Sequence, residues 1–130
     1  MIEWDFIDHP EWFEARSRGD RSDPGRVTAL WDAIVAHARA RDVHHVLMVQ
    51  QLEGRLSPQL VFADHGPLQA WLRRLDWPLV VAVVDPNPES YHDNMILAGQ
   101  AREQGIDARL FEREEAAREW LLACLEDGRP

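Results

Sequence analysis

Six consecutive apolar residues, Leu-Val-Val-Ala-Val-Val at positions 79–84, constrain the fold of this chain more than any other segment. A strand with one face in water alternates apolar and polar side chains, whereas an unbroken apolar run is typical of a strand covered on both faces. Pro78 precedes the run and Asp85-Pro86-Asn87-Pro88 follows it. Proline donates no hydrogen bond to a sheet, so these residues mark the ends of the strand. The run therefore predicts a central strand of an α/β sheet with helices above and below it.

Other apolar periodicities predict that the rest of the chain alternates between strands and helices. Residues 2–7 and 11–18 are two expected strands joined at Asp8-His9-Pro10, and this short connector predicts an antiparallel hairpin at an edge of the sheet. Further strands are expected over residues 46–49 and 108–111, and helices over 24–41, 67–75, 88–104 and 112–126, with a short helical turn over 58–64. The order ββαβαβαβα predicts one α/β domain over residues 1–130, with a mixed, mostly parallel, five-stranded sheet and about four helices.

Local chemistry predicts the ends and the buried faces of the helices. Asp23-Pro24 predicts a helix start, because an aspartate caps free backbone N–H groups and proline fits the first turn. Gly105 predicts a helix end, where glycine adopts the left-handed backbone conformation. Apolar spacing predicts one apolar face of helix 88–104, with Tyr91, Met95, Ala98 and Ala101. The last helix is expected to turn inward Ala116, Ala117, Trp120, Leu121 and Cys124.

The charge balance and the lack of long apolar segments exclude several classes of protein. The formal net charge is −9, and an acidic chain repels phosphate backbones, so we expect no nucleic-acid partner. No apolar run approaches the ~20 residues of a transmembrane helix, and residues 1–20 contain no signal-peptide core. The single cysteine, Cys124, cannot form an internal disulfide. The expected location is the cytoplasm.

The last third of the sequence carries a family resemblance. Residues 101–111 read AREQGIDARLF, and residues 114–121 read EEAAREWL. This segment resembles the end of the SpoIIAA-like group of the STAS (sulfate-transporter and anti-sigma-antagonist) fold, where a strand ending in Arg-x-Phe precedes a helix with Glu-Ala and Trp-Leu. Leu30-Trp31-Asp32 also resembles residues that such proteins often carry in the first helix. The resemblance implies a bacterial STAS-like domain, with a mostly parallel sheet, that acts in regulation or protein interaction without catalysis.

The resemblance also implies a regulatory site. In anti-sigma antagonists of this fold, a serine at the start of the second helix is phosphorylated, and Ser57 occupies the analogous place. Those antagonists carry an Asp-Ser-x-Gly stretch there, whereas residues 53–58 of this chain read EGRLSP. Ser57 is therefore a candidate phosphoacceptor, or it only caps the helical segment that begins at Pro58.

Polar residues follow the carboxyl end of the predicted central strand, where open α/β sheets usually bind ligands. Asp85, Asn87, Ser90 and Tyr91 make this segment a candidate ligand loop for a small molecule or a cation. Asp, Asn and Pro are also ordinary turn residues, and Asn87 or Ser90 can simply cap the next helix. The sequence leaves both interpretations open.

No motif in the sequence indicates catalysis, a metal or another cofactor. His44-His45 precedes a strand, where neighbouring rings point to opposite faces and are poorly placed to share a metal. The sequence has no His-x-x-x-His or Cys-x-x-Cys pair, no Gly-x-Ser-x-Gly nucleophile and no phosphate-binding glycine loop. We therefore expect no enzyme, no cofactor and no metal site.

Two functions remain as hypotheses. The first is a non-catalytic STAS/SpoIIAA-like regulatory or protein-interaction module, whose hairpin edge binds a protein partner or forms a homodimer. The second is a small apolar-ligand or lipid-binding domain, similar in layout to SEC14-like lipid binders. Its pocket would use residues 91–98 and the apolar side chains of residues 52–66, which otherwise pack on the sheet.

Overall fold

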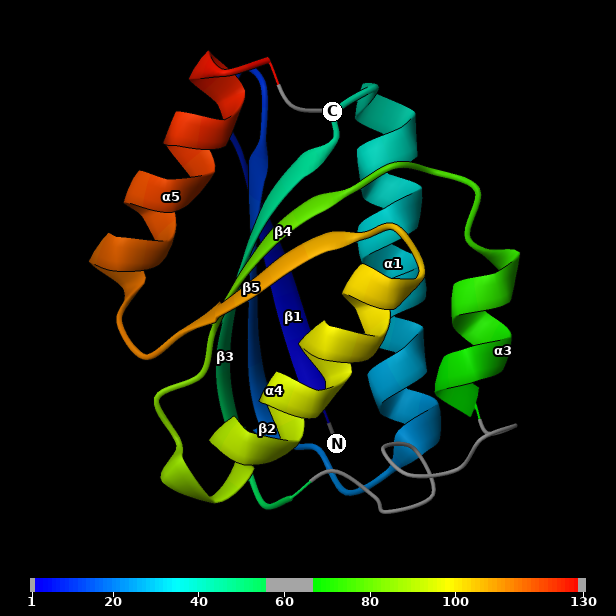
Figure 1. The fold of residues 1–130 in the computed structure, drawn as a ribbon. Helices are drawn as coiled ribbons and strands as arrows, with labels where there is room; N and C mark the ends of the chain where they lie inside the picture. The colour runs from blue at the N-terminus through cyan, green and yellow to red at the C-terminus, as the bar shows by residue number, and fades with distance from the viewer. Residues whose placement is uncertain (1, 56–66, 129–130) are drawn as a thin grey trace.

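The computed structural model describes residues 2–55 and 67–128, and Figure 1 shows one twisted sheet with helices on both sides. The predicted short turn over 58–64 lies outside the described residues. The elements are β1 (Ile2–Asp8), β2 (Phe13–Asp20), α1 (Pro24–Arg41), β3 (His45–Glu53), α3 (Pro67–Arg74), β4 (Val80–Val84), α4 (Pro88–Glu103), β5 (Asp107–Phe111) and α5 (Glu114–Glu126). The predicted α/β fold with the order ββαβαβαβα is confirmed.

The five strands lie in the order β1-β2-β3-β4-β5, with β1 antiparallel to β2 and all the other pairs parallel. Along the chain, each parallel strand is followed by the strand next to it in the sheet, always in the same direction. Because such crossovers are right-handed, the connecting helices α1, α3 and α4 all lie on one face (Figure 1). Helix α5 follows the last strand and packs on the opposite face. The mixed five-stranded sheet and its antiparallel hairpin at one edge are therefore as predicted.

The apolar run at residues 79–84 forms β4, which is covered on both faces as predicted. Val81 belongs to the core under α1, α3 and α4, whereas Val80 and Ala82 belong to the core under α5. The middle strand of the sheet is nevertheless β3. It runs over nine residues, longer than the apolar pattern 46–49 predicts, because its polar second half pairs with the polar end of β2.

Two apolar cores lie on the two faces of the sheet. The larger one joins α1, α3 and α4 to the sheet and includes Phe13, Leu30, Ile34, Val46, Met48, Leu72, Val81 and Leu97. The smaller one joins α5 to β3 and β4 and includes Trp12, Leu47, Val49, Ala82, Ala117, Leu121 and Cys124. The alternation of side chains along the strands assigns neighbouring residues to different cores.

The predicted helix ends are confirmed by their backbone geometry. The Asp23 side chain accepts a hydrogen bond from the Gly25 amide at the start of α1. Gly105 has a φ of +92°, and the Ile106 amide donates back to the carbonyl of Ala101 after the end of α4. These contacts satisfy backbone groups that have no partner within the helix itself.

Two predicted helix faces are correct only in part, since Ala98 and most of the α5 set are buried as predicted. Met95 is 51% exposed and Tyr91 only half-buried, whereas α4 buries Ser90, Asp93, Asn94, Leu97 and Ala98. The polar members of this face meet polar partners at the strand ends, so an apolar stripe does not mark it. In α5 the buried residues are Ala117, Leu121 and Cys124, and Ala116 is exposed because it lies about 100° around the helix from Ala117.

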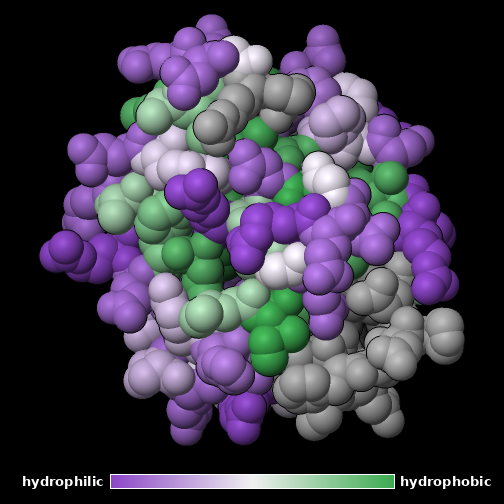
Figure 2. Space-filling model, viewed as in Figure 1, coloured by the Kyte–Doolittle hydropathy of each residue, from purple (hydrophilic) through white to green (hydrophobic). Residues whose placement is uncertain are grey.

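The surface of the molecule is largely polar. In Figure 2 hydrophobic residues appear as patches among hydrophilic ones on the face that carries α4 and β5. Among the described residues, the large apolar side chains that are exposed are Ile7, Met95 and Leu122. The described helices include none with the length and apolar character needed to span a bilayer.

Candidate functional site

A buried polar cluster lies at the carboxyl ends of β3 and β4, where the sequence places its candidate ligand loop. We call it the Asp85 network; its members are Arg21, Gln50, Asp85, Ser90 and Asn94, all buried. Arg21 directly follows β2 and Asp85 directly follows β4, so the parallel strands bring them to the same edge of the sheet. Gln50 lies in β3, and Ser90 and Asn94 lie in the first two turns of α4.

Asp85 is saturated with hydrogen bonds inside this network. Arg21 Nη1 donates to Asp85 Oδ2 at 3.1 Å, and Ser90 Oγ donates to the same oxygen at 2.7 Å. Asn94 Nδ2 also donates to Oδ2, and the amide of Asn87 donates to Oδ1 at 3.1 Å. A carboxylate offers about four acceptor positions, so these partners occupy its capacity. The carboxylate therefore ties β2, β4 and α4 together and faces no solvent.

Three residues of the candidate ligand loop, Asp85, Asn87 and Ser90, thus lie together, and their hydrogen bonds stabilise the fold. Asn87 Oδ1 accepts a hydrogen bond from the Glu89 amide at 3.0 Å and caps α4, and its Nδ2 donates to the Leu52 carbonyl at 3.3 Å. Ser90 is fully buried against Asp85. Tyr91 is not a member of this buried network: it is half-buried and lines two surface hollows, one with Met95 and Leu110 and the other beside Asp85 and Pro88. The candidate phosphoacceptor, Ser57, lies outside the described residues.

A second ion pair holds the end of β3 against α4. Arg55 donates from Nε and Nη2 to the two carboxylate oxygens of Asp93, at 3.1 and 2.9 Å. The hydrogen bonds to Asp93, together with its negative charge, raise the pKa of Arg55 above its ordinary value. The Asp93 side chain is 2% exposed, whereas that of Arg55 is 64% exposed. The arginine thus covers a buried carboxylate from the solvent side.

An apolar pocket opens between α1, α3, α4 and the sheet. Its volume is about 90 Å³. The lining comprises Trp31, Ile34, Val35, Met48, Gln50, Trp71, Leu72, Leu79, Val81, Val83, Asn94, Leu97, Ala98, Ala101, Ile106 and Ala108. This set shares Asn94, Leu97 and Ala98 with the predicted pocket segment 91–98. Of the other predicted segment, Leu52 is buried in the core and is not among these lining residues, and residues 56–66 lie outside the described residues.

Aromatic and amide side chains give this pocket its chemical character. Trp31 of α1 and Trp71 of α3 pack with ring centroids 5.3 Å apart, and Trp71 Nε1 donates to Asp32 Oδ1 at 2.6 Å. The only polar residues among the described lining are Gln50 and Asn94. Asn94 Nδ2 donates to Gln50 Oε1 at 3.2 Å, which makes the pair the common boundary of the pocket and the Asp85 network.

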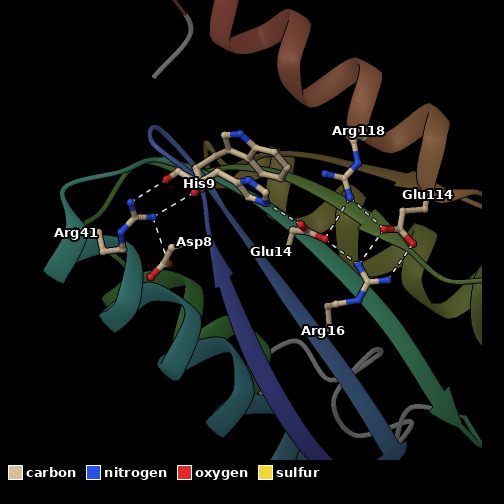
Figure 3. A network of polar contacts seen from close by, with 8 residues as sticks. Asp8, His9, Glu14, Arg16, Arg41, Glu114 and Arg118 are labelled. Atoms are coloured by element: carbon tan, nitrogen blue, oxygen red, sulfur yellow. Dashed lines mark hydrogen bonds and ion pairs between the residues drawn. The ribbon is translucent and has the colours of Figure 1, made fainter.

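A second polar cluster lies on the other face of the sheet, beside the start of α5 (Figure 3). We call it the Glu14 network; its members are His9, Glu14, Arg16, Glu114 and Arg118. Figure 3 shows the Glu14 carboxylate between His9 and Arg118, with Arg16 reaching across to Glu114. Arg16 donates to both oxygens of Glu114, at 2.8 and 3.0 Å. These contacts join the beginning of β2 to the first turn of α5.

The ion pairs of this cluster shift the pKa values of its carboxylates. Burial raises the pKa of Glu14, but the hydrogen bonds from His9 and Arg118 outweigh burial, so the net pKa lies below its ordinary value. The hydrogen bond from Arg16 is the main reason that the pKa of Glu114 is lowered. Both glutamates are therefore stabilised in the charged form.

Metal binding finds no support in the geometry of the described part of the chain. No group of three or more His, Cys, Asp or Glu side chains there is arranged to hold a metal ion. His9 and His37 each contact a carboxylate, Glu14 and Asp8, at 2.7 Å.

Sequence reasoning missed the members of the two networks that lie outside the ligand loop. Arg21 stands in a polar segment that predicts a surface loop, and Asn94 falls between the apolar residues of the expected stripe. The available signal for Arg21 is its position directly after a strand, since parallel neighbours end at one edge of a sheet. Glu14 breaks the apolar alternation of its strand, which is the signal for a buried charge with partners.

Comparisons of this chain with family models, with curated proteins and with solved structures gave no match.

Proposed function

We propose that the protein is a non-catalytic binding module whose pocket between α1, α3 and α4 holds a small, mainly apolar molecule. The observation that carries this proposal is the pocket itself, lined by apolar and aromatic side chains with two amide groups at one end. Ligand sites in proteins commonly combine an apolar lining with a few polar groups that orient the ligand. The volume of about 90 Å³ is smaller than the roughly 150 Å³ of a cavity that encloses benzene, so a molecule of one ring would fill the pocket and extend out through its opening.

The burial of the polar side chains at the carboxyl ends of the strands supports binding over catalysis. Ligand-activating groups usually lie at the carboxyl ends of the strands, and here Asp85 and Ser90 occupy that place. Both side chains are fully buried and bonded to each other at 2.7 Å. A carboxylate in this state cannot reach a substrate as a general base.

The proposal is tested with a small apolar probe and a variant that fills the pocket. The probe is 4-ethyltoluene, and its binding is followed by chemical-shift changes of pocket residues in NMR spectra. Ala98→Leu adds apolar volume to the lining, and we expect it to weaken probe binding at least tenfold. Ala116→Leu, on the exposed side of α5, is the matched control and should bind like the wild type. Native mass spectrometry of fresh protein should also detect a co-purified small molecule.

Two results would contradict this function. One is the absence of any probe binding by the wild-type protein at concentrations near the solubility limit of the probe. The other is equal probe binding by wild type and Ala98→Leu, provided that circular dichroism shows both to be folded, because the probe would then bind elsewhere.

A second candidate function is a STAS/SpoIIAA-like regulatory module that acts in the cytoplasm through protein contacts. The resemblance and its order of elements favour this function, and one observation adds a surface for it. Strand β1 is an edge strand, and Ile7 on it is 44% exposed. If β1 joins a second copy, sedimentation should show a dimer that Ile7→Asp dissociates. A monomer at all concentrations would leave only a different protein as partner.

Phosphorylation at Ser57 would add regulation to this second function. Incubation of the protein with cell extract and labelled ATP should then transfer label to the wild type and not to Ser57→Ala. An unlabelled wild type, or equal labelling of both proteins, would remove Ser57 as the phosphoacceptor.

A further inference from the structure

We propose that the ligand of the apolar pocket carries one uncharged group with both a hydrogen-bond donor and an acceptor, such as a carboxamide or a lactam, and that Gln50 and Asn94 recognise it. This inference rests on the proposed function and specifies the class of ligand. It depends on how the Asp85 network fixes the orientation of the two amides.

Asp85 determines which way the Asn94 amide faces. An ionised carboxylate only accepts hydrogen bonds, so the Asn94 group beside it must be the Nδ2 amino group. The structure places Asn94 Nδ2 against Asp85 Oδ2 and also 3.2 Å from Gln50 Oε1. Both protons of the Asn94 amino group are therefore used. Gln50 in turn must present its oxygen to Asn94, which fixes the second amide.

This arrangement leaves a defined pair of polar groups at the end of the pocket. With Asn94 Nδ2 and Gln50 Oε1 engaged, Gln50 retains its Nε2 donor and Asn94 its Oδ1 acceptor. Both residues line the pocket, and both are more than nine-tenths buried. A buried polar group is stable only with a hydrogen-bond partner, so a ligand that fills the pocket has to match a donor and an acceptor. A carboxamide or a lactam offers N–H and C=O side by side.

The same geometry disfavours a charged ligand. None of the described lining residues carries a charge. Asp85, which accepts a hydrogen bond from Asn94, is neutralised by Arg21 at 3.1 Å, and the side chains of both are 0% exposed. Asp93 is likewise paired, with Arg55. A carboxylate or an ammonium group in the pocket would lose its hydration without gaining an opposite charge. Asp85 acts here as a positioning residue, since its contact with the pocket runs through Asn94.

The experiment compares three probes of the same shape. They are 4-ethylbenzamide, 4-ethylbenzoate and 4-ethyltoluene, which differ only in a neutral donor–acceptor group, a charged group and a methyl group. Their dissociation constants are measured by NMR titration for the wild type, for Gln50→Met and for Gln51→Met. Methionine is close to glutamine in length and removes the donor, and Gln51 is an exposed neighbour on the opposite face of β3.

We expect the wild type to bind the amide probe at least tenfold more tightly than the benzoate. Gln50→Met should weaken binding of the amide about threefold to tenfold, the range of one or two hydrogen bonds, and leave binding of 4-ethyltoluene unchanged. Gln51→Met should match the wild type for all three probes. This pattern supports recognition of the amide by Gln50.

Failure of this inference differs from failure of the proposed function. If the wild type binds 4-ethyltoluene but shows no preference for amide over benzoate, or if Gln50→Met weakens all probes equally, the inference is wrong and the apolar pocket stands. If none of the three probes binds the wild type, both the pocket function and the inference are wrong.

Discussion

The Asp85 network and the Glu14 network lie on opposite faces of the same sheet and differ in how their charges are balanced. In the first, the side chains of Arg21 and Asp85 are 0% exposed, and the remaining partners are neutral. In the second, Glu14 is 7% exposed, but its partners His9, Arg16 and Arg118 are 31–35% exposed. One network is a single ion pair in a dry interior, and the other is a chain of ion pairs open to water on one side.

This difference in exposure predicts how much stability is lost when one charged side chain is removed from each network. A buried ion pair has no substitute partner, so the loss of one member leaves the other uncompensated in the interior. A partly exposed cluster with several partners for each charge can rearrange and admit water. Both networks join elements that are distant in sequence, but only in the first does charge neutralisation depend on one ion pair. Substitutions in the Asp85 network should therefore lower the free energy of unfolding more than substitutions in the Glu14 network.

The largest effect is expected for Arg21→Met. This change keeps the apolar volume of the side chain and leaves Asp85 charged and unpaired in the interior. The free energy of unfolding, measured with urea, should fall by about 3–5 kcal/mol. Arg18→Met, which removes an exposed arginine paired with Glu3 and Asp5, serves as the control and should lie within about 0.5 kcal/mol of the wild type. If the two substitutions lowered the free energy of unfolding equally, the buried ion pair would be no more important for stability than an exposed one.

A second change should partly reverse the first. In the Arg21→Met background, Asp85→Asn removes the stranded charge, and the free energy of unfolding should recover by about 1–3 kcal/mol. In the wild-type background the same change should destabilise, because it leaves Arg21 as the unpaired charge. The double-mutant cycle measures this sign reversal. Additive destabilisation would show that Arg21 contributes by packing and not by neutralising Asp85.

A smaller effect, with a pH dependence, is expected for Glu14→Gln. At pH 7 the free energy of unfolding should fall by about 1–2 kcal/mol, since charge-assisted hydrogen bonds from three partners are lost. The pKa values of Glu14 and Glu114 are lowered in the folded protein. Their contribution is therefore complete above the ordinary carboxyl pKa near 4.5 and disappears as the pH falls through the lowered values.

Thermal unfolding between pH 7 and pH 3 measures this dependence. The melting temperature of the wild type should drop below pH 4.5 more steeply than that of Glu14→Gln, so that the two curves converge at low pH. Parallel curves would mean that Glu14 contributes no pH-dependent stability.

The smallest effect is expected for Arg118→Gln. Glu14 keeps His9 and Arg16 as partners, and Glu114 keeps Arg16. Because the Arg118 side chain is 35% exposed, water can replace its contacts, and the loss in unfolding free energy should be about 0.5 kcal/mol. Arg41→Gln, which loses carbonyl contacts at the hairpin, is a comparison of similar exposure. A loss as large as that of Arg21→Met would remove the distinction between the two networks.

Much of the fold is predictable because its signals are local. The run at residues 79–84, the Asp23 cap and Gly105 each act through their own backbone or their immediate neighbours. The element order follows from such signals. The strand order can also be predicted, since short crossovers usually place successive parallel strands next to each other.

The candidate site is less predictable because its partners are remote. Arg21 and Asp85 are 64 positions apart, and neither side chain alone indicates burial. The inward face of α4 has polar residues in its first turns, so the apolar stripe through Met95 predicts the wrong side. The apolar pocket arises from three helices and the sheet together, and no single segment carries its pattern.

Because Cys124 is buried under α5, chemical labelling of its thiol can report the opening of this helix. It is the sole thiol, 2% exposed, and it packs between α5 and the sheet. A maleimide in solution can reach the sulfur only when α5 detaches from the sheet or the whole chain opens. The labelling rate of the native protein therefore measures how often this last helix lifts, without any introduced dye site.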